Sequence, residues 1–307
     1  MPECDTVWLA ARRLHDALAG RLLTHTDFRT PSLATADLSG ETIVEVVSRG
    51  KHLLMRTDAG RTLHTHFRMD GAWHLYRPGA RWSGGPSWQV RAVLTNADWQ
   101  AVGYRLPVVE LLPTDAEESV VGHLGPDLLG PDWDAMRAAA RLRARPEREI
   151  GPALLDQRNL AGIGNLYKTE TLYLSGVTPW TPVGDVPDLD AVIKRAHRLL
   201  HANKEHWHQT TTGTVRRGDE RWVFERPGRP CRRCGTTIAA AMQAEPDQPT
   251  YARISYWCPR CQRGPAPAER TPAEATPIEG TAEVTSADGS ADVMPVEGTA
   301  EAKRTAP

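Results

Sequence analysis

The 307-residue sequence lacks any long run of apolar residues. No stretch approaches the ~18 consecutive apolar residues of a membrane-spanning helix, which excludes a membrane span. Residues 1–5 are acidic and lack the apolar core of a secretion signal, so we expect a cytoplasmic protein. Cysteine is also scarce: five cysteines without a secretion signal argue against a disulfide framework and for a reducing compartment.

Glycine and proline, at 25 and 24 residues, are too few for a fibrous or fully disordered chain. Hydrophobic residues make up 40% of the sequence, so a sizeable core can form, and the length predicts one large domain or two ordinary ones. The formal net charge of −1 hides an asymmetry, because residues 216–263 hold ten Arg against five acids. That excess suggests a polyanionic partner, and a solvated arginine-rich surface is the competing interpretation.

The segment 264–307 has no aromatic residue and is low in complexity. It carries eight acids and three bases, and residues 277–283 recur with small changes as 295–301. Such a segment cannot bury enough apolar surface to offset the entropy of ordering it. We therefore expect a disordered acidic tail.

Residue periodicity predicts an α+β fold. Apolar residues recur at helical spacing over 5–19, where Asp5 or Thr6 can cap the start and Gly20 ends the helix. The period then falls to about two, which predicts an antiparallel β-sandwich over 20–113. Helical spacing returns after residue 132. The expected strands are 42–47, 52–56, 61–66, 89–94 and 108–112, and the expected helices are 133–144, 150–157, 165–174 and 189–206.

Two CxxC pairs form the strongest single motif: Cys231 with Cys234, and Cys258 with Cys261, with 23 residues between the pairs. Four thiolates in two such knuckles suit one structural Zn²⁺ in a closed tetrahedral site, which leaves no position for catalysis. Two unrelated pairs, or a redox CxxC, are the alternatives, but no βαβ pattern accompanies them. By itself the zinc unit indicates only nucleic-acid or protein binding. We interpret His201, His206 and His208 as a solvated helix end.

The N-terminus offers a nucleophile. Methionine is normally removed before a small residue, and its loss would give Pro2 a free secondary amine. Attack of such an amine on an aldehyde-level carbon gives an iminium, which is a strong electron sink. Glu3 lies beside it as a candidate general acid, although Pro and Glu at these positions are also common by chance.

Considered together, the motifs resemble the formamidopyrimidine-DNA glycosylase/endonuclease VIII family, and within it the actinobacterial endonuclease VIII-like branch. The resemblance covers residues 2–262, and the motifs stand in the family's order. They lie at 1–7, 48–54, 66–71, 154–157, 161–167 and 253–262.

The resemblance implies roles for four catalytic residues. Pro2 would attack C1′ of the damaged nucleotide, and Glu3 would protonate the sugar ring oxygen. Lys51 would shuttle protons during β-elimination and contact phosphate, with an ordinary strand-end lysine as the alternative. Arg253 would clamp a phosphate through its planar guanidinium and assist δ-elimination.

The resemblance also implies DNA contacts. Asn165 and the turn that holds Gly162 and Gly164 would bind phosphates at a helix start. Met69, next to Arg68, would fill the gap left by the flipped-out nucleotide, with a core methionine as the alternative.

Several residues depart from the family pattern. Cys4 replaces a glycine, where a thiol could oxidise or crowd the pocket, and Thr6 replaces a glutamate. The finger is longer than usual, and the Arg–Phe void-filling loop of the formamidopyrimidine branch is not evident. The missing loop favours the endonuclease VIII side of the family, which acts on oxidised pyrimidines.

We therefore expect a bifunctional DNA glycosylase and AP lyase of base-excision repair, with double-stranded DNA containing damaged bases or abasic sites as its partner. It would be a monomer in the bacterial cytoplasm, associated with the nucleoid. A catalytically silent relative that recognises abasic or branched DNA is the main alternative, and a zinc-ribbon transcription factor is a third. The expected parts are a catalytic β-sandwich domain (2–113), a helix–two-turn–helix DNA-binding domain (114–217), a zinc β-hairpin finger (218–263) and the tail (264–307).

Overall fold

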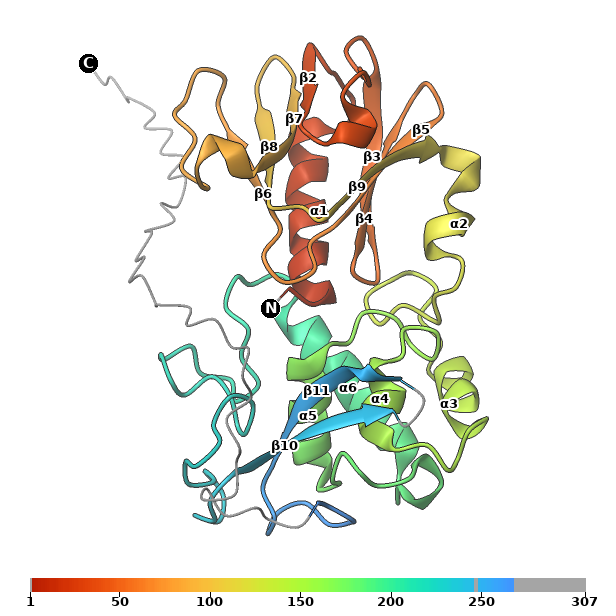
Figure 1. Ribbon diagram of the computed structural model, residues 1–307, viewed down its shortest axis with the longest axis vertical. Helices are drawn as coiled ribbons and strands as arrows, with labels where there is room; N and C mark the ends of the chain where they lie inside the picture. The colour runs from red at the N-terminus through yellow and green to blue at the C-terminus, as the bar shows by residue number, and fades with distance from the viewer. Residues whose placement is uncertain (1, 246–247, 268–307) are drawn as a thin grey trace, which may run out of the picture. The chain divides into compact units, whose positions relative to one another are not determined.

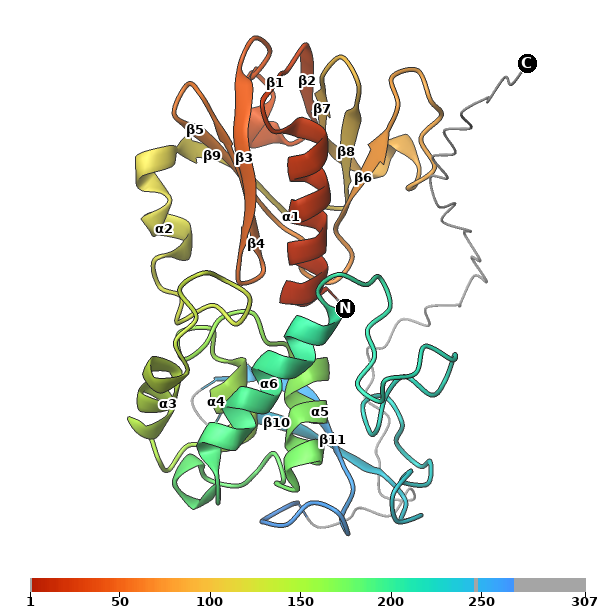
Figure 2. The same cartoon turned by 180° about the vertical axis from the view of Figure 1, so that it is seen from behind.

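Helix α1 (Cys4–Leu18) opens the fold and packs its apolar face on the strands that follow (Figures 1 and 2). The structure is a computed structural model that describes residues 2–245 and 248–267. Most of the predicted disordered tail lies outside the described residues. Asp5 and Thr6 do not cap α1, as the sequence suggested, because the helix begins one residue earlier with Glu3 at the N-cap position. Asp5 is instead buried in the first turn.

Nine strands follow α1 in two antiparallel sheets, as the sandwich pattern predicts. One sheet has the order β1-β3-β4-β5-β9 and the other the order β2-β7-β8-β6. Apolar side chains of both sheets enclose a core with α1. The strands are β1 (Arg21–Leu22), β2 (His25–Phe28), β3 (Thr42–Arg49), β4 (His52–Thr57), β5 (Arg61–His66), β6 (Ala72–Tyr76), β7 (Val90–Thr95), β8 (Gln100–Tyr104) and β9 (Val108–Pro113).

The expected strands are all present, and four more were missed. Strands β1 and β2 have four residues or fewer, and β8 contains Gly103, so none of them gives a clear alternating pattern. Strand β6 has only five residues, with Trp73 and Leu75 on one face and Ala72, His74 and Tyr76 on the other, which is too short for a clear pattern. Short 3-10 helices lie at Pro31–Leu33, Ser87–Gln89, Thr114–Ala116 and Val183–Asp185.

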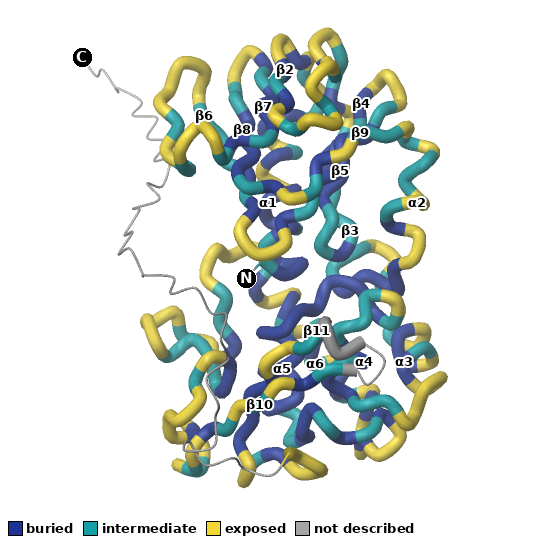
Figure 3. Tube along the Cα trace, in the orientation of Figure 1, coloured by how far each residue is buried: buried dark blue, intermediate teal, exposed yellow. Residues whose placement is uncertain are grey.

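Helices dominate the next part of the chain and enclose a second core. The buried helix α5 lies at its centre and packs on α4, α6 and strand β11. Figure 3 shows buried backbone in the interior of this part of the chain and more exposed backbone around it. The helices are α2 (Glu118–Val121), α3 (Ala135–Arg143), α4 (Ile150–Leu155), α5 (Asn165–Ser175) and α6 (Leu189–Asn203).

A β-hairpin of β10 (Ala239–Glu245) and β11 (Gln248–Trp257) completes the fold. Strand β11 packs on α5 and leads directly into the second cysteine knuckle. The α+β class, with two antiparallel sheets followed by helices and a hairpin, is confirmed. No helix among the described residues is long and apolar enough to cross a membrane.

Candidate active site and metal centre

The Glu3 side chain joins the start of α1 to the start of α5. Its carboxylate is fully buried and accepts hydrogen bonds from the backbone N–H groups of Gly164 (2.6 Å) and Leu166 (2.8 Å). These N–H groups lie in the first turn of α5, where the helix itself provides no acceptor. Glu3 thus caps a helix that lies more than 160 residues along the chain.

Gly164 is required by this close approach. A Cβ built on Gly164 would lie 2.5 Å from Cδ of Glu3, so any other residue would displace the carboxylate. The Gly-x-Gly turn therefore serves first to receive Glu3, which the sequence did not indicate. Its role toward phosphate remains a prediction.

The surroundings of Glu3 favour its protonated form. Burial raises the pKa of Glu3 to about 7, while attraction to Lys51 and the two backbone N–H bonds oppose a further rise. Lys51 is half-buried between β3 and β4, next to Gly50 at φ +57°, and burial lowers the pKa of its ammonium. The structure thus brings Glu3 and Lys51 together, with the half-buried Pro2 beside Glu3 in sequence.

Cys4, the departure that raised doubt, packs against Gly162. Its backbone N–H donates to the Gly162 carbonyl at 3.2 Å, and its Sγ lies 2.6 Å from where a Gly162 Cβ would stand. Gly162 also has a φ of +106°, which favours glycine. Burial raises the pKa of Cys4 well above its ordinary value, so the thiol stays protonated and unreactive.

Asp5 anchors a distant loop at this site. Its carboxylate accepts hydrogen bonds from the Tyr167 hydroxyl (2.6 Å) and from Nε2 of Gln209 (3.0 Å to each oxygen). Sequence reasoning missed both partners, since neither lies in a recognisable pattern with Asp5. Burial raises the pKa of Asp5, and the two donors oppose that rise.

Two side chains of α5 hold strand β11. The Asn165 amide donates to the Ile254 carbonyl at 2.9 Å, and the Lys168 ammonium donates to Oγ of Ser255 at 2.7 Å. Lys168 is fully buried, and burial lowers its pKa to about 7. Asn165 therefore lies at the site, but its amide contacts the finger strand in this structure. These bonds hold β11 at the two residues that follow Arg253.

Arg253 itself is exposed and has no acidic partner among the described residues. Its guanidinium donates only to the carbonyl of Ala252 at 3.1 Å. A cation fixed at its backbone and free at its tip is suited to an anionic ligand.

Arg68 and Met69 lie in the turn between β5 and β6, and both are exposed. Met69 keeps 57% of its surface accessible, so the alternative of a core methionine is wrong. Arg68 has a φ of +48°, a strained value for a non-glycine residue. The Arg105 guanidinium donates to the Asp70 carbonyl at 3.1 Å and braces the turn from the neighbouring β8–β9 connection.

His66 is a candidate site residue that the sequence analysis missed. Its Nδ1 accepts the backbone N–H of Arg68 at 2.9 Å, which leaves the proton of a neutral ring on Nε2. Burial and the nearby Lys51 lower the pKa of His66 to about 4. His66 is the first residue of the family-like motif at 66–71, and this position was the one sequence feature that could have indicated it.

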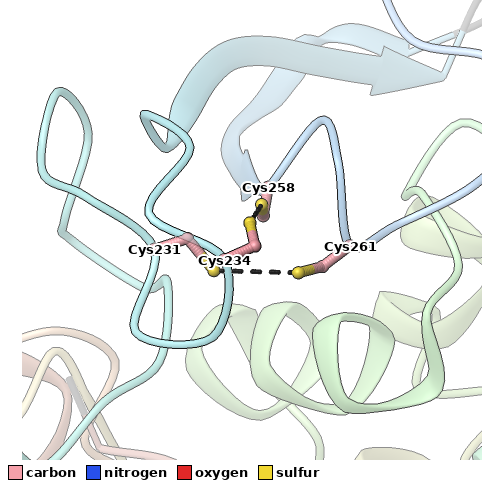
Figure 4. A group of neighbouring side chains, drawn as sticks. All are labelled: Cys231, Cys234, Cys258 and Cys261. Carbon is pink, nitrogen blue, oxygen red and sulfur yellow. Dashed lines mark hydrogen bonds between the residues drawn. The ribbon is translucent and has the colours of Figure 1, made fainter.

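The four cysteines of the two CxxC pairs converge on one point (Figure 4). Their sulfur atoms all lie within 4.8 Å of one another, with Cys231 3.8 Å from Cys261 and Cys234 3.5 Å from Cys258. A tetrahedron with Zn–S bonds of ~2.3 Å has S···S edges of about 3.8 Å. The four residues are therefore positioned to hold a metal ion, and their all-thiolate chemistry fits zinc.

Glu170, also on α5, holds the segment that leads into the first knuckle. This buried carboxylate accepts the backbone N–H groups of Trp222, Val223 and Phe224, each at 2.8 Å, and the Thr211 hydroxyl. Helix α5 thus organises three parts of the site: the acid, the finger strand and the approach to the metal centre.

The fold joins a β-sandwich to a helical part that carries a hairpin with four cysteines, and Glu3 at the start of α1 caps helix α5 of the helical part. This combination is that of a DNA glycosylase. Two family models match: the formamidopyrimidine-DNA glycosylase N-terminal domain over residues 1–105 and its H2TH domain over residues 124–212. The chain belongs to the formamidopyrimidine-DNA glycosylase family. The resemblance inferred from the sequence, and the prediction of an enzyme of the DNA glycosylase and AP lyase class, are confirmed.

Individual relatives agree. "Probable endonuclease 8 2" of Streptomyces coelicolor is 57% identical over 269 residues, covering 87% of this chain and 96% of that protein. A DNA-(apurinic or apyrimidinic site) lyase of Mycolicibacterium smegmatis is 44% identical over 262 residues, covering 85% of this chain and 99% of that one. The structure of Lactococcus lactis formamidopyrimidine-DNA glycosylase bound to abasic-site DNA matches the fold with a TM-score of 0.70. That match covers 86% of this chain and 100% of the other, at 23% identity.

Proposed function

We propose that this chain is a bifunctional DNA glycosylase and AP lyase that removes oxidised bases through an N-terminal proline Schiff base. The observation that carries the proposal is the buried Glu3 carboxyl beside Pro2, with a pKa of about 7 and Lys51 nearby. A carboxyl that is half protonated near neutral pH suits a general acid. The arrangement also agrees with the names of the two relatives described above.

In the first step, the Pro2 nitrogen forms a bond to C1′ and the damaged base leaves with the electrons of the glycosidic bond. The proton that the Pro2 nitrogen then loses balances the proton that the departing base takes up. Glu3 donates its proton to the ring oxygen, the C1′–O bond breaks, and an iminium remains on Pro2. Glu3 must hold that proton while buried, and its raised pKa meets this need. Lys51, whose ammonium pKa is lowered by burial, accepts and returns protons during the reaction.

Strand cleavage follows from the iminium. Loss of the C2′ proton breaks the bond between C3′ and the 3′-phosphate in β-elimination, and a second elimination releases the 5′-phosphate. The exposed, unpaired Arg253 binds the phosphate next to the lesion and assists this second step. His66 offers its Nε2–H as a further phosphate donor, next to Lys51.

The turn after β5 acts on the duplex. The exposed Met69 enters the gap left by the flipped nucleotide, and Arg68 lies beside it against the backbone. For Asn165, Gly162 and Gly164 to support the phosphates near the start of α5, their N–H groups would exchange the bonds that they donate to Ile254, Gln157 and Glu3. Phe67 is buried in the core and Arg105 is held by intramolecular bonds, so the described residues place no free Arg–Phe pair beside Met69. This supports a preference for oxidised pyrimidines.

One Zn²⁺ bound by the four cysteines would serve structure alone. All four positions around the metal would be filled by thiolates, so it would offer no site to a substrate. Its contribution would be to fix the knuckles from which β11 and Arg253 extend. The chain would act as a monomer.

Borohydride trapping on an abasic-site duplex tests the proposal. Reduction of the iminium would give a covalent protein–DNA product that joins the DNA to Pro2, located by peptide mass spectrometry. Pro2→Gly should reduce trapping strongly while DNA affinity stays within a few-fold. Wild-type binding without any trapped product would instead support the catalytically silent relative. Full trapping by protein with an acetylated N-terminus would refute the role of the proline.

A further inference from the structure

Three chain segments meet at one end of the four-stranded sheet. Ala72 of β6 and Val90 of β7 both pair with Tyr104 of β8, so the connections next to these residues share that end. We call these connections the sheet rim: residues 67–71, 84–89 and 105–107. The rim includes the Met69 turn, to which the proposed function assigns a place in the duplex.

Arg105 joins the three segments into one unit. Its guanidinium donates to the Asp70 carbonyl (3.1 Å), to Oε1 of Gln89 (2.5 Å) and to the Gly84 carbonyl (3.4 Å). Arg105 has a φ of +49°, like Arg68 on the neighbouring segment at +48°. Two strained arginines on adjacent turns indicate that the surrounding structure holds the rim in a defined shape.

The outer part of the rim exposes an aromatic ring. Trp88 lies on the 3-10 helix Ser87–Gln89 and keeps 71% of its surface accessible. Among the described residues, no ring contact or side-chain hydrogen bond holds the Trp88 ring. The nearby Trp82 ring, by contrast, donates a hydrogen bond to Gln100 and has the Arg29 guanidinium over its face. An exposed, rigid aromatic residue of this kind is typical of a binding surface.

Positive charge accompanies Trp88. No Asp or Glu occurs from residue 71 to residue 97, whereas Arg77, Arg81 and Arg91 do. None of the three has an acidic partner among the described residues, and Arg81 is exposed with no hydrogen bond. Arg91 donates to the Trp88 carbonyl at 2.8 Å and holds that turn in place. The exposed Asp70 lies in the rim on the Met69 turn, outside this stretch. Arginines that share a chain segment with an exposed flat ring match the chemistry of a sugar–phosphate backbone.

We propose that Trp88 of the rim, together with Arg81 of the β6–β7 connection and Arg91 of β7, binds the backbone of the duplex on one side of the lesion. This inference rests on the proposed function, because it places the duplex against the same rim as Met69. The rim continues from Met69 in one direction along the sheet end. The DNA footprint is therefore longer on one side of the lesion than on the other.

The test compares three abasic duplexes: a short one, one extended on the 5′ side of the lesion and one extended on the 3′ side. Fluorescence anisotropy should show that one extension tightens wild-type binding by about three- to ten-fold and steepens the salt dependence. Trp88→Ala and Arg81→Ala should remove that gain and leave short-duplex affinity unchanged. Neither change removes a side-chain hydrogen bond, ion pair or ring contact among the described residues. Arg12→Ala, which removes an equal charge from α1 together with its exposed ion pair to Asp16, is the control.

Borohydride trapping on the short duplex separates the two proposals. Wild-type trapping with identical length dependence in Trp88→Ala, Arg81→Ala and wild type would overturn the rim inference and leave the proposed function intact. Absence of wild-type trapping would count against the proposed function alone. A gain from single-stranded but not duplex extensions, lost in Trp88→Ala, would also overturn the inference, since it would assign the rim to unpaired DNA.

Discussion

The buried Glu3 side chain and the exposed Arg253 and Met69 side chains differ in how fully the structure holds them. Glu3 is inaccessible to solvent, and both carboxylate oxygens accept backbone N–H groups. Arg253 and Met69 are exposed, and within the described part of the chain Met69 has no side-chain partner and Arg253 has one carbonyl. Under the proposed function, Glu3 must hold a proton, and its preorganisation fits this because its pKa depends on exclusion of water. Arg253 and Met69 would contact DNA, and the duplex would supply the contacts that the free protein lacks.

This contrast predicts that Glu3 tolerates no replacement. Glu3→Gln keeps the size of the side chain but cannot supply a proton, so base excision should fall by about 10²- to 10⁴-fold. Because burial raises the pKa of Glu3 to about 7, the acid form is present below pH 7 and lost above it. The ratio of the wild-type rate of base excision to the Glu3→Gln rate should therefore decline above about pH 7, because the Pro2 amine titrates equally in both proteins. Single-turnover rates between pH 5.5 and 9 measure this ratio, with about pH 7 as its expected inflection. A ratio that stays constant or rises through this range would contradict the assignment.

Loss of the metal should affect the exposed Arg253, because Arg253 lies on strand β11 of the zinc finger. Cys258→Ser removes one ligand, and structural zinc supplies much of the folding free energy of such small units. The protein should bind about one zinc per chain, and the variant should lose zinc together with most of its DNA affinity. Hydrogen exchange should show loss of protection in β10 and β11 but not in β3 to β5. Metal analysis that finds active wild-type protein free of zinc would refute this.

Substitutions of Arg253 test the proposed DNA contact of this exposed residue directly. Arg253→Ala loses a charge-assisted contact worth roughly 1.5–3 kcal/mol, which is about ten- to a hundred-fold in binding. The salt slope of affinity should fall by about one unit, and products should shift toward β-elimination. Arg253→Lys keeps the charge without the planar fork, so it should recover only part of the binding. An unchanged slope with an unchanged product ratio would exclude Arg253 from the site.

The tail should have the smallest effect. Residues 268–307 carry the eight acids of the tail and three bases, so their charge opposes DNA. A variant ending at Pro267 should keep its trapping rate and bind DNA slightly more tightly at low salt, with the difference lost at high salt. Full-length protein in the same buffers is the control. A large loss of activity on truncation would contradict the expected passive role.

Much of the fold follows from local sequence patterns. The apolar spacing of α1 and the alternation in β3, β4 and β5 depend on neighbouring residues, and the structure confirms these elements. The two CxxC pairs likewise predicted that the four cysteines lie together, because thiolate pairs at that spacing serve few other purposes, and the structure confirms it. The short strands β1 and β2 were missed because two to four residues carry too little periodicity.

The sequence by itself determined which residues are the candidates for chemistry and metal binding, since Pro2, Glu3 and the cysteines belong to motifs formed by residues close together in the chain. Only the tertiary structure decided what Glu3 and Gly164 do to each other, because 161 residues separate them and no local pattern links an acid to a distant helix start. The same holds for Arg105, whose three acceptors come from other segments of the sheet rim. Burial and backbone hydrogen bonds are properties of the folded chain, and they set the pKa on which the proposed chemistry depends.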